Sequence, residues 1–246
     1  MQLQTEAIVL RATKYSESDV ILNVYTQKYG KIGVYAKNAR RLKNPLMSSA
    51  QVFAHSNMII STYDGRFRLS KSELINNNYN ITAEFERINL GYYYLQFVEK
   101  IGQEGEVNLK LFNLLKSALE ALQQNNNYFL QKITFDMKVI DIFGYKPVVD
   151  RCAACQKSND IGNLADISSG GRVCAACAEK HASKALEKLD STSYKLMDFI
   201  QKNNYPVIME ARVNVSILKE VNMFLNKFID YHFENLELST RKYLNY

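Results

Sequence analysis

Residues 20–37 read VILNVYTQKYGKIGVYAK, and the expected fold follows first from their pattern of apolar residues. On both sides of the sequence Tyr29-Gly30-Lys31, apolar residues recur at every second position. One face of the stretch carries Val20, Leu22, Val24, Ile32, Val34 and Ala36. A period of two is that of a β-strand with one buried face, and a glycine between two such runs is typical of a turn. The stretch therefore predicts two strands joined at residues 29–31.

Further strand signals lie on both sides of this stretch. Residues 7–10 form a short apolar run, and residues 52–60 are expected to form one longer strand segment. Asp64-Gly65 is a strong hairpin signal, because the favoured turn needs positive φ at its central residues. Alternation then continues over residues 67–71. About five short strands in about 75 residues favour a small closed barrel, with the five-stranded OB barrel as the leading candidate.

The pattern changes after the asparagine-rich segment 76–80, which reads as a linker. From there apolar residues recur at three- and four-residue spacing, which is typical of amphipathic helices. The expected helices cover residues 85–99, 107–122, 129–143, 192–203 and 213–233. The chain is thus expected to be α+β. We predict an OB-type nucleic-acid-binding domain over residues 1–78 and an all-α domain over residues 79–246, with a cysteine module inserted at about residues 148–180.

The inserted module contains all four cysteines of the chain, as Cys152-x-x-Cys155 and Cys174-x-x-Cys177. Each Cys-x-x-Cys turn can direct two thiolates at one point, and two turns complete the tetrahedron that Zn²⁺ prefers. Four protein ligands leave no open position, so a zinc ion here would be structural. The alternatives are two disulfides or four free thiols, a site that binds iron, and a site that has lost its metal. His181 could substitute for one ligand.

Charge is unevenly distributed along the chain. Residues 1–80 hold eleven Lys/Arg and five Asp/Glu, which equals the net charge of +6 of the whole chain. The remainder is neutral. A polyanionic partner for the first third is the natural inference, and a solvated basic surface without a partner is the alternative.

The expected barrel would present basic and aromatic side chains on its outer face. Alternation puts Lys31, Tyr35 and Lys37 on the side opposite the core, and Arg66 and Arg68 on one side of the last strand. A positive groove with stacking rings is how such barrels bind single strands. The predicted DNA-binding residues are Lys31, Lys37, Arg40, Arg41, Lys43, Arg66 and Arg68, with Tyr25 and Tyr35 for stacking. Two interpretations compete with this one. The tyrosines could be half-buried sheet residues, or the DNA single strand could bind to the helical part at Lys138, Lys146, Arg241 and Lys242.

No combination of residues indicates a reaction. The histidines are His55, His181 and His232, far apart in the chain, and the phosphate-loop, nucleophile-elbow and zinc-protease motifs are absent. We therefore expect no enzyme activity. No apolar run reaches the roughly 18 residues of a membrane span, and the first residues do not resemble a secretion signal, so a cytoplasmic protein is expected.

Several segments resemble the bacterial RecO proteins. The resemblance begins with residues 5–11, TEAIVLR, and residues 15–19, YSESD. It continues through Thr26, residues 29–31 and residues 36–41, and ends with the weaker match of Tyr231-His232 and residues 238–244. The order of barrel, helices and mid-chain cysteines agrees as well. Asn38 stands where the family often has glycine, and not every member has the four cysteines.

The resemblance implies a function that the residues alone do not give. It implies a recombination mediator in DNA repair that binds single- and double-stranded DNA and anneals complementary strands. It also implies work with RecR in loading RecA on strands coated by single-strand-binding protein, contact with that protein's acidic C-terminal tail, and location at the bacterial nucleoid. Two other classes remain open. One is a zinc-ribbon nucleic-acid enzyme, which would need clustered carboxylates for Mg²⁺, and the other is a protein-interaction scaffold.

Overall fold

The computed structural model describes residues 2–63, 65–159, 161–180 and 186–244. They divide into two compact units, each described by itself. The first unit runs to Asn126 and includes the C-terminal segment that begins at Leu238, and the second runs from Asn127 to Glu237.

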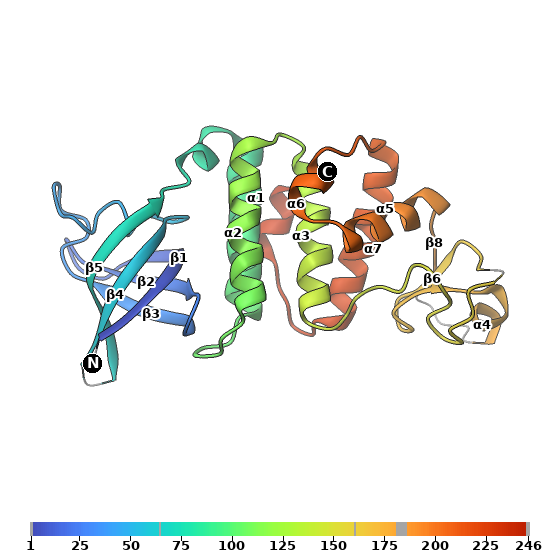
Figure 1. The fold of residues 1–246 in the computed structure, drawn as a ribbon, viewed down its shortest axis with the longest axis horizontal. Coiled ribbons are helices and arrows are strands. Elements are labelled where there is room, and N and C mark those ends of the chain that lie inside the picture. Colours follow the sequence, from blue (N-terminus) through green and yellow to red (C-terminus); the bar gives the residue numbers. More distant parts are fainter. Residues whose placement is uncertain (1, 64, 160, 181–185, 245–246) are drawn as a thin grey trace. The chain divides into compact units, whose positions relative to one another are not determined.

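The first unit opens with a closed five-stranded barrel (Figure 1). Its strands are β1 (Gln2–Lys14), β2 (Val20–Thr26), β3 (Gly30–Ala36), β4 (His55–Tyr63) and β5 (Arg66–Asn76). The order around the barrel is β1-β2-β3-β5-β4, and only the β3–β5 pair is parallel among the barrel strands. The expected barrel and its β4–β5 hairpin are confirmed, with Asp64 of the turn lying outside the described residues.

The barrel core follows the alternation in the sequence. Val24 pairs with Ile32 and Leu22 with Val34, so apolar side chains on neighbouring strands point to the same interior. These four residues are buried. The prediction of one strand over residues 52–60 is wrong at its start, because Phe53 has a φ of +72° and β4 begins only at His55. The predicted linker is also too long at its start, since β5 extends to Asn76.

Gly30 lets the backbone at Glu106 approach the barrel closely. Its φ is +63°, and a Cβ built there would lie 2.1 Å from the backbone oxygen of Glu106. We expect Gly30→Ala to lower the free energy of unfolding by more than the roughly 1–2 kcal/mol of a left-handed backbone, because Glu106 would have to move as well. Urea unfolding measures the loss.

Gly65→Ala is the matched control for this variant. Gly65 has a φ of +71°, but no described atom lies within 4 Å of a Cβ built there. The control therefore carries the backbone strain without the clash. Equal loss of stability in both variants would contradict a role for the approach to Glu106.

Helices complete the first unit. They are η1 (Tyr79–Ala83), α1 (Phe85–Ile101), α2 (Leu109–Gln124) and η2 (Ser239–Tyr243). Asn108 caps α2 by accepting a hydrogen bond from the Leu111 amide at 3.0 Å. Gln96 on α1 contacts η2, with its amide nitrogen 2.8 Å from Ser239 Oγ. The strand-to-helix change thus occurs where the sequence predicts it.

The second unit is helical, with α3 (Tyr128–Ile142), α5 (Ser191–Lys202), α6 (Tyr205–Met209) and α7 (Val215–His232). Helix α3 packs against α5, α6 and α7. Its Lys132 is buried, and its ammonium lies 2.7 Å from Asp136 and 2.6 Å from Asn222 of α7. A buried cation must be paired in this way, so this network fixes how α3 meets α7.

Between α3 and α5 the chain forms the small cysteine module. It contains β6 (Leu164–Asp166), β7 (Gly171–Val173), α4 (Ala175–Lys180) and β8 (Leu186–Lys188), with the strands in the order β7-β6-β8. In the part of the module that the structure describes, the apolar cluster has the buried members Cys152, Val173 and Ala178. Among the described residues, no helix combines the length and apolarity needed to cross a bilayer.

Candidate functional site

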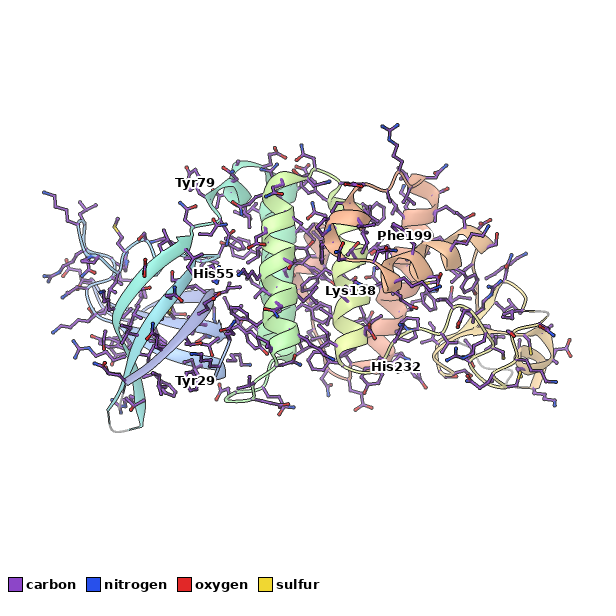
Figure 2. The ribbon with its side chains drawn as sticks, viewed as in Figure 1. Tyr29, His55, Tyr79, Lys138, Phe199 and His232 are labelled. Carbon is purple, nitrogen blue, oxygen red and sulfur yellow. The ribbon has the colours of Figure 1, made fainter. Side chains whose placement is uncertain are left out.

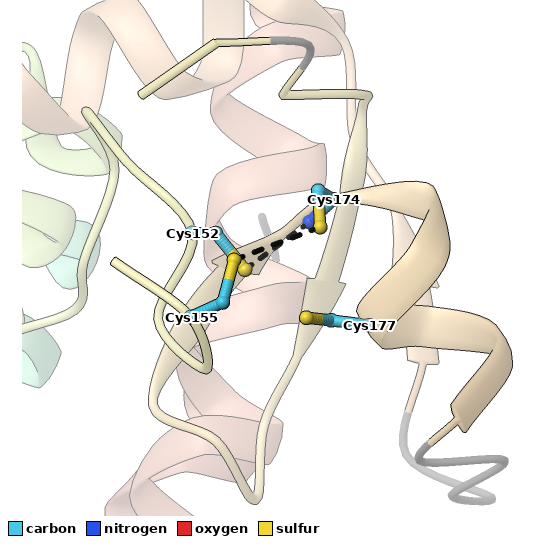
Figure 3. Close-up of side chains that lie close together, drawn as sticks. All are labelled: Cys152, Cys155, Cys174 and Cys177. Carbon is cyan, nitrogen blue, oxygen red and sulfur yellow. Dashed lines mark hydrogen bonds between the residues drawn. The ribbon is translucent and has the colours of Figure 1, made fainter. Parts of the chain in front are cut away.

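The first cysteine pair lies on a tight turn before β6. The Gln156 amide donates to the Cys152 carbonyl at 2.9 Å, and the Cys152 amide donates to the carbonyl of Lys157 at 2.8 Å. Gln156 has a φ of +64°, which the turn requires. This conformation directs the side chains of Cys152 and Cys155 to the same side of the turn (Figure 3).

The second pair lies where β7 passes into α4. The amides of Cys177 and Ala178 donate to the Cys174 carbonyl, which starts the helical turn. All four sulfurs lie within 4.8 Å of one another, and the Cys155 and Cys174 sulfurs are 3.9 Å apart (Figure 3). A tetrahedral zinc ion with Zn–S bonds of about 2.3 Å separates its sulfurs by about 3.8 Å. The four cysteines are thus compatible with a metal site.

The pKa values of Cys152 and Cys177 are shifted in opposite directions. Desolvation raises the pKa of Cys152, but the backbone amides of Cys155, Cys174 and Ala154 outweigh it and lower that pKa to about 6. Hydrogen bonds with the sulfurs of Cys174 and Cys155 raise the pKa of Cys177 to about 12. Several thiolates this close repel one another, so a central cation is what would stabilise all four in the deprotonated form.

Arg172 and Gly171 hold the module together. The Arg172 guanidinium donates to the carbonyls of Gly162 and Ile161 and stacks over the Tyr194 ring of α5, 4.3 Å from its centroid. A Cβ on Gly171 would lie 2.3 Å from the Val148 carbonyl oxygen, so only glycine allows this contact. No sequence motif points to Arg172, because its partners are main-chain oxygens.

The predicted DNA-binding residues gather partly on one side of the barrel. Lys37 and Arg68 line the same cavity of about 440 Å³, together with Ser61 and Ser70. Tyr35 on β3 pairs with Arg68 on β5 in the parallel ladder. The side chains of Lys37, Arg40, Arg41, Lys43, Arg66 and Arg68 are exposed.

Asp19 anchors the basic turn after β3 to the barrel. Its carboxylate accepts hydrogen bonds from the Asn38 amide at 2.7 Å and from the Tyr35 hydroxyl at 2.8 Å. The Asn38 amide is the main reason that the pKa of Asp19 falls to about 2, so this acid stays ionised under all physiological conditions. Asn38 itself has a φ of +56°, which asparagine tolerates in place of glycine. Asp19 lies in the segment 15–19 that resembles the RecO proteins, but the sequence alone indicates no role for it.

Tyr35 remains a candidate for base stacking. Its ring is half-buried and meets the ring of Tyr15 edge-on, with centroids 5.7 Å apart. Tyr15 is 66% exposed, so this pair offers an aromatic surface beside the basic turn. The hydrogen bond to Asp19 raises the pKa of Tyr35, which keeps its hydroxyl protonated.

We expect Tyr35→Ala to weaken single-strand binding by roughly 1–3 kcal/mol with little change of salt dependence, because stacking releases no counterions. Tyr35→Phe is the control, since it keeps the ring and removes only the bond to Asp19. Fluorescence anisotropy with a labelled oligonucleotide at several salt concentrations measures both. Equal losses in the two variants would contradict stacking.

Two of the predicted DNA-binding residues are not free to contact DNA in this structure. The structure corrects the choice of Tyr25, which is 1% exposed and packs against the chain at Gly102. Lys31 is half-buried, and its ammonium donates to the Glu99 carbonyl at 2.7 Å near the C-terminal end of α1. Alternation correctly puts both residues outside the barrel core, but helix α1 covers that part of the outer face.

The basic residues of the alternative DNA-binding site also have partners within the protein in part. Lys138 lies on α3 (Figure 2), and its ammonium donates to the Asn203 carbonyl at 2.7 Å beyond the end of α5. Desolvation is the main cause of the lowered pKa of Lys138. Lys146 is exposed, whereas Arg241 is half-buried in η2, and Lys242 lies over the ring of Tyr243.

The histidines form no common site among the described residues. His55 on the barrel is buried and lies 2.8 Å from Glu6, and His232 on α7 lies 3.0 Å from the Ile167 carbonyl (Figure 2). They belong to different compact units. His181, the possible substitute ligand, lies outside the described residues.

Comparisons with known proteins cover nearly the whole chain. Residues 1–78 match the family model "Recombination protein O N terminal", and residues 83–242 match "Recombination protein O C terminal". The DNA repair protein RecO of Caldanaerobacter subterraneus subsp. tengcongensis is 30% identical, over 94% of this chain and 93% of its own length. That of Alkaliphilus metalliredigens is 28% identical, over 98% and 97%.

Proposed function

The chain belongs to the RecO family of DNA repair proteins, and on that premise we propose that it binds single- and double-stranded DNA through its barrel and anneals complementary strands. The proposed contacts are Lys37, Arg40, Arg41, Lys43, Arg66 and Arg68 with phosphates, and Tyr35 with bases. Lys31 would contribute only if its ammonium left Glu99. Tyr25 is not part of the proposal.

One observation carries this proposal. The basic side chains of β5 and of the turn after β3 are exposed on the same barrel, and the first 80 residues hold all the net positive charge of the chain. Phosphates attract such a surface whatever the base sequence, and a nearby ring adds stacking that is equally indifferent to it. A protein that pairs any two complementary strands needs this lack of sequence preference.

Titration with a labelled single strand at several salt concentrations tests the proposal. The affinity should decrease by about 0.7 log units per log unit of salt for each phosphate that the protein neutralises. A protein-interaction scaffold would show no binding even at low salt, and that result would overturn the proposal.

The proposed partners follow from the family and are chemically consistent with the charge. We propose that the chain works with RecR to load RecA on DNA coated by single-strand-binding protein, at the bacterial nucleoid. Contact with the acidic C-terminal tail of single-strand-binding protein would be favoured by a chain of net charge +6.

We also propose that Cys152, Cys155, Cys174 and Cys177 hold one structural zinc ion. The support is the sulfur spacing and the donor set, since four thiolates select zinc or iron and leave no position for water. The ion would hold the module together, and none of the proposed DNA contacts involves the module.

The purified protein should neither cleave DNA nor hydrolyse ATP. No described cluster of three or more His, Cys, Asp or Glu side chains other than the four cysteines is arranged to hold a metal ion. Incubating supercoiled plasmid with Mg²⁺ and following ATP hydrolysis measures both activities. Cleavage that co-purifies with the chain and is lost on mutation of one of its acidic residues would favour the zinc-ribbon enzyme instead.

A further inference from the structure

The turn after β3 carries an exposed leucine at its tip. Leu42 is 86% exposed, the highest value among the exposed large apolar side chains of the described residues. Arg41 and Lys43 flank it and are themselves exposed. Residues 37–43 contain four basic residues and no acidic one. The leucine is therefore presented in a strongly positive surrounding.

Hydrogen bonds hold this turn in one conformation. The amide of Arg41 donates to the Asn38 carbonyl at 3.0 Å, and the amide of Asn44 donates to the Arg41 carbonyl at 3.1 Å. The amide of Arg40 donates to the Ser18 carbonyl, which ties the turn to the loop before β2. Lys43 has a φ of +66°, a conformation that a lysine keeps only where its surroundings impose it. Leu42 is thus held away from the barrel core by an anchored turn.

The ligand of such a tip must combine dense negative charge with apolar surface. Nucleic acids do so, because phosphates surround the faces of the bases. Leucine is among the side chains that proteins insert against base steps. Opening a closed step inside a duplex costs more than one leucine can offset, whereas a base-pair face at the end of a duplex is already open.

We propose that Leu42 packs against the open base face where a single strand meets a duplex, and so gives the chain a preference for such junctions. This inference rests on the proposed DNA binding by the barrel. Arg41 and Lys43 would bind the phosphates on either side of the junction. The preference would suit annealing, since every growing duplex presents a junction at its end.

Leu42→Ala in the full chain tests the proposal with three DNA molecules. They are a duplex with a single-stranded overhang, a single strand, and a relaxed, covalently closed circular duplex, which has neither ends nor unpaired loops. Leu42→Met preserves an apolar tip, and Leu109→Ala is the matched control, because Leu109 is 49% exposed but lies at the start of α2. A 2-aminopurine at the first unpaired position reports unstacking at the junction.

The wild-type protein should prefer the junction and brighten the 2-aminopurine. Leu42→Ala should weaken junction binding roughly tenfold, which is near the low end of the free energy gained by burying a leucine side chain. Its binding to the other two molecules and its salt dependence should not change. Leu42→Met and Leu109→Ala should behave like the wild type.

Two results would overturn the inference while the proposed DNA binding stands. One is equal affinity of Leu42→Ala and wild type for the junction. The other is Leu42-dependent binding to phosphatidylserine vesicles with no effect of Leu42 on DNA, which would assign the tip to a membrane surface. Wild-type protein that binds none of the three DNA molecules at low salt would overturn the proposed function itself.

Discussion

Replacing Cys174 by serine should unfold the cysteine module and leave the barrel intact. Structural zinc contributes roughly 10–16 kcal/mol in small zinc-dependent modules. Among the described residues, the module's apolar cluster has three buried members. One of them is the ligand Cys152, and the ligands Cys174 and Cys177 pack against the cluster, so loss of the metal would also disrupt the apolar packing. Amide hydrogen exchange should show lost protection across residues 148–180, and metal analysis should show lost zinc.

Ala154→Ser is the matched control for this experiment. It adds a hydroxyl at an exposed position between Cys152 and Cys155 without removing a ligand. This variant should retain one metal ion per chain and normal protection. If freshly purified wild-type protein contained neither zinc nor iron and all four thiols were free, the metal assignment would be wrong.

The double substitution Arg40→Ala/Arg41→Ala should weaken binding to all DNA sequences alike. Exposed charge contacts contribute on the order of 0.2–1 kcal/mol each, so a roughly tenfold loss at low salt is expected. For a single strand, the plot of log affinity against log salt concentration should become less steep. The change should correspond to the loss of about one to two phosphate contacts, at about 0.7 per contact. Filter binding or anisotropy at four or more salt concentrations measures both quantities.

Lys100→Ala/Lys110→Ala removes the same charge from exposed positions on α1 and near the start of α2. It should change affinity far less, because only long-range attraction is lost. Since Arg40 also donates to the Glu17 carbonyl, urea unfolding must show that both double variants are equally folded. Unchanged binding by the Arg40/Arg41 variant, with loss in an Arg241→Ala/Lys242→Ala variant, would move the site to η2.

The elements with strong periodicity could be predicted from the sequence. Residues 20–36 alternate cleanly, and the structure pairs β2 with β3 in the corresponding register. The long helices were predicted to within a few residues for the same reason. The cysteine cluster could also be predicted from the sequence, because two short turns contain all four ligands. No distant contact has to be known to recognise them.

Features that depend on distant contacts could not be predicted. Alternation puts Tyr25 on the outer face of β2, but it does not reveal that α1 and Gly102 cover that face. The three-residue strands of the cysteine module are too short to show a period. The anchoring of the basic turn by Asp19 joins residues 19 positions apart, and a single carboxylate gives no sign of such a partner.

Photo-cross-linking tests most directly whether the barrel binds DNA. A single strand with 5-iododeoxyuridine at several positions is irradiated with the full chain, and the modified peptides are mapped by mass spectrometry. We expect adducts at Tyr35 or Tyr15 and within residues 37–43. Adducts confined to residues 127–237, with the barrel peptides unmodified, would contradict it.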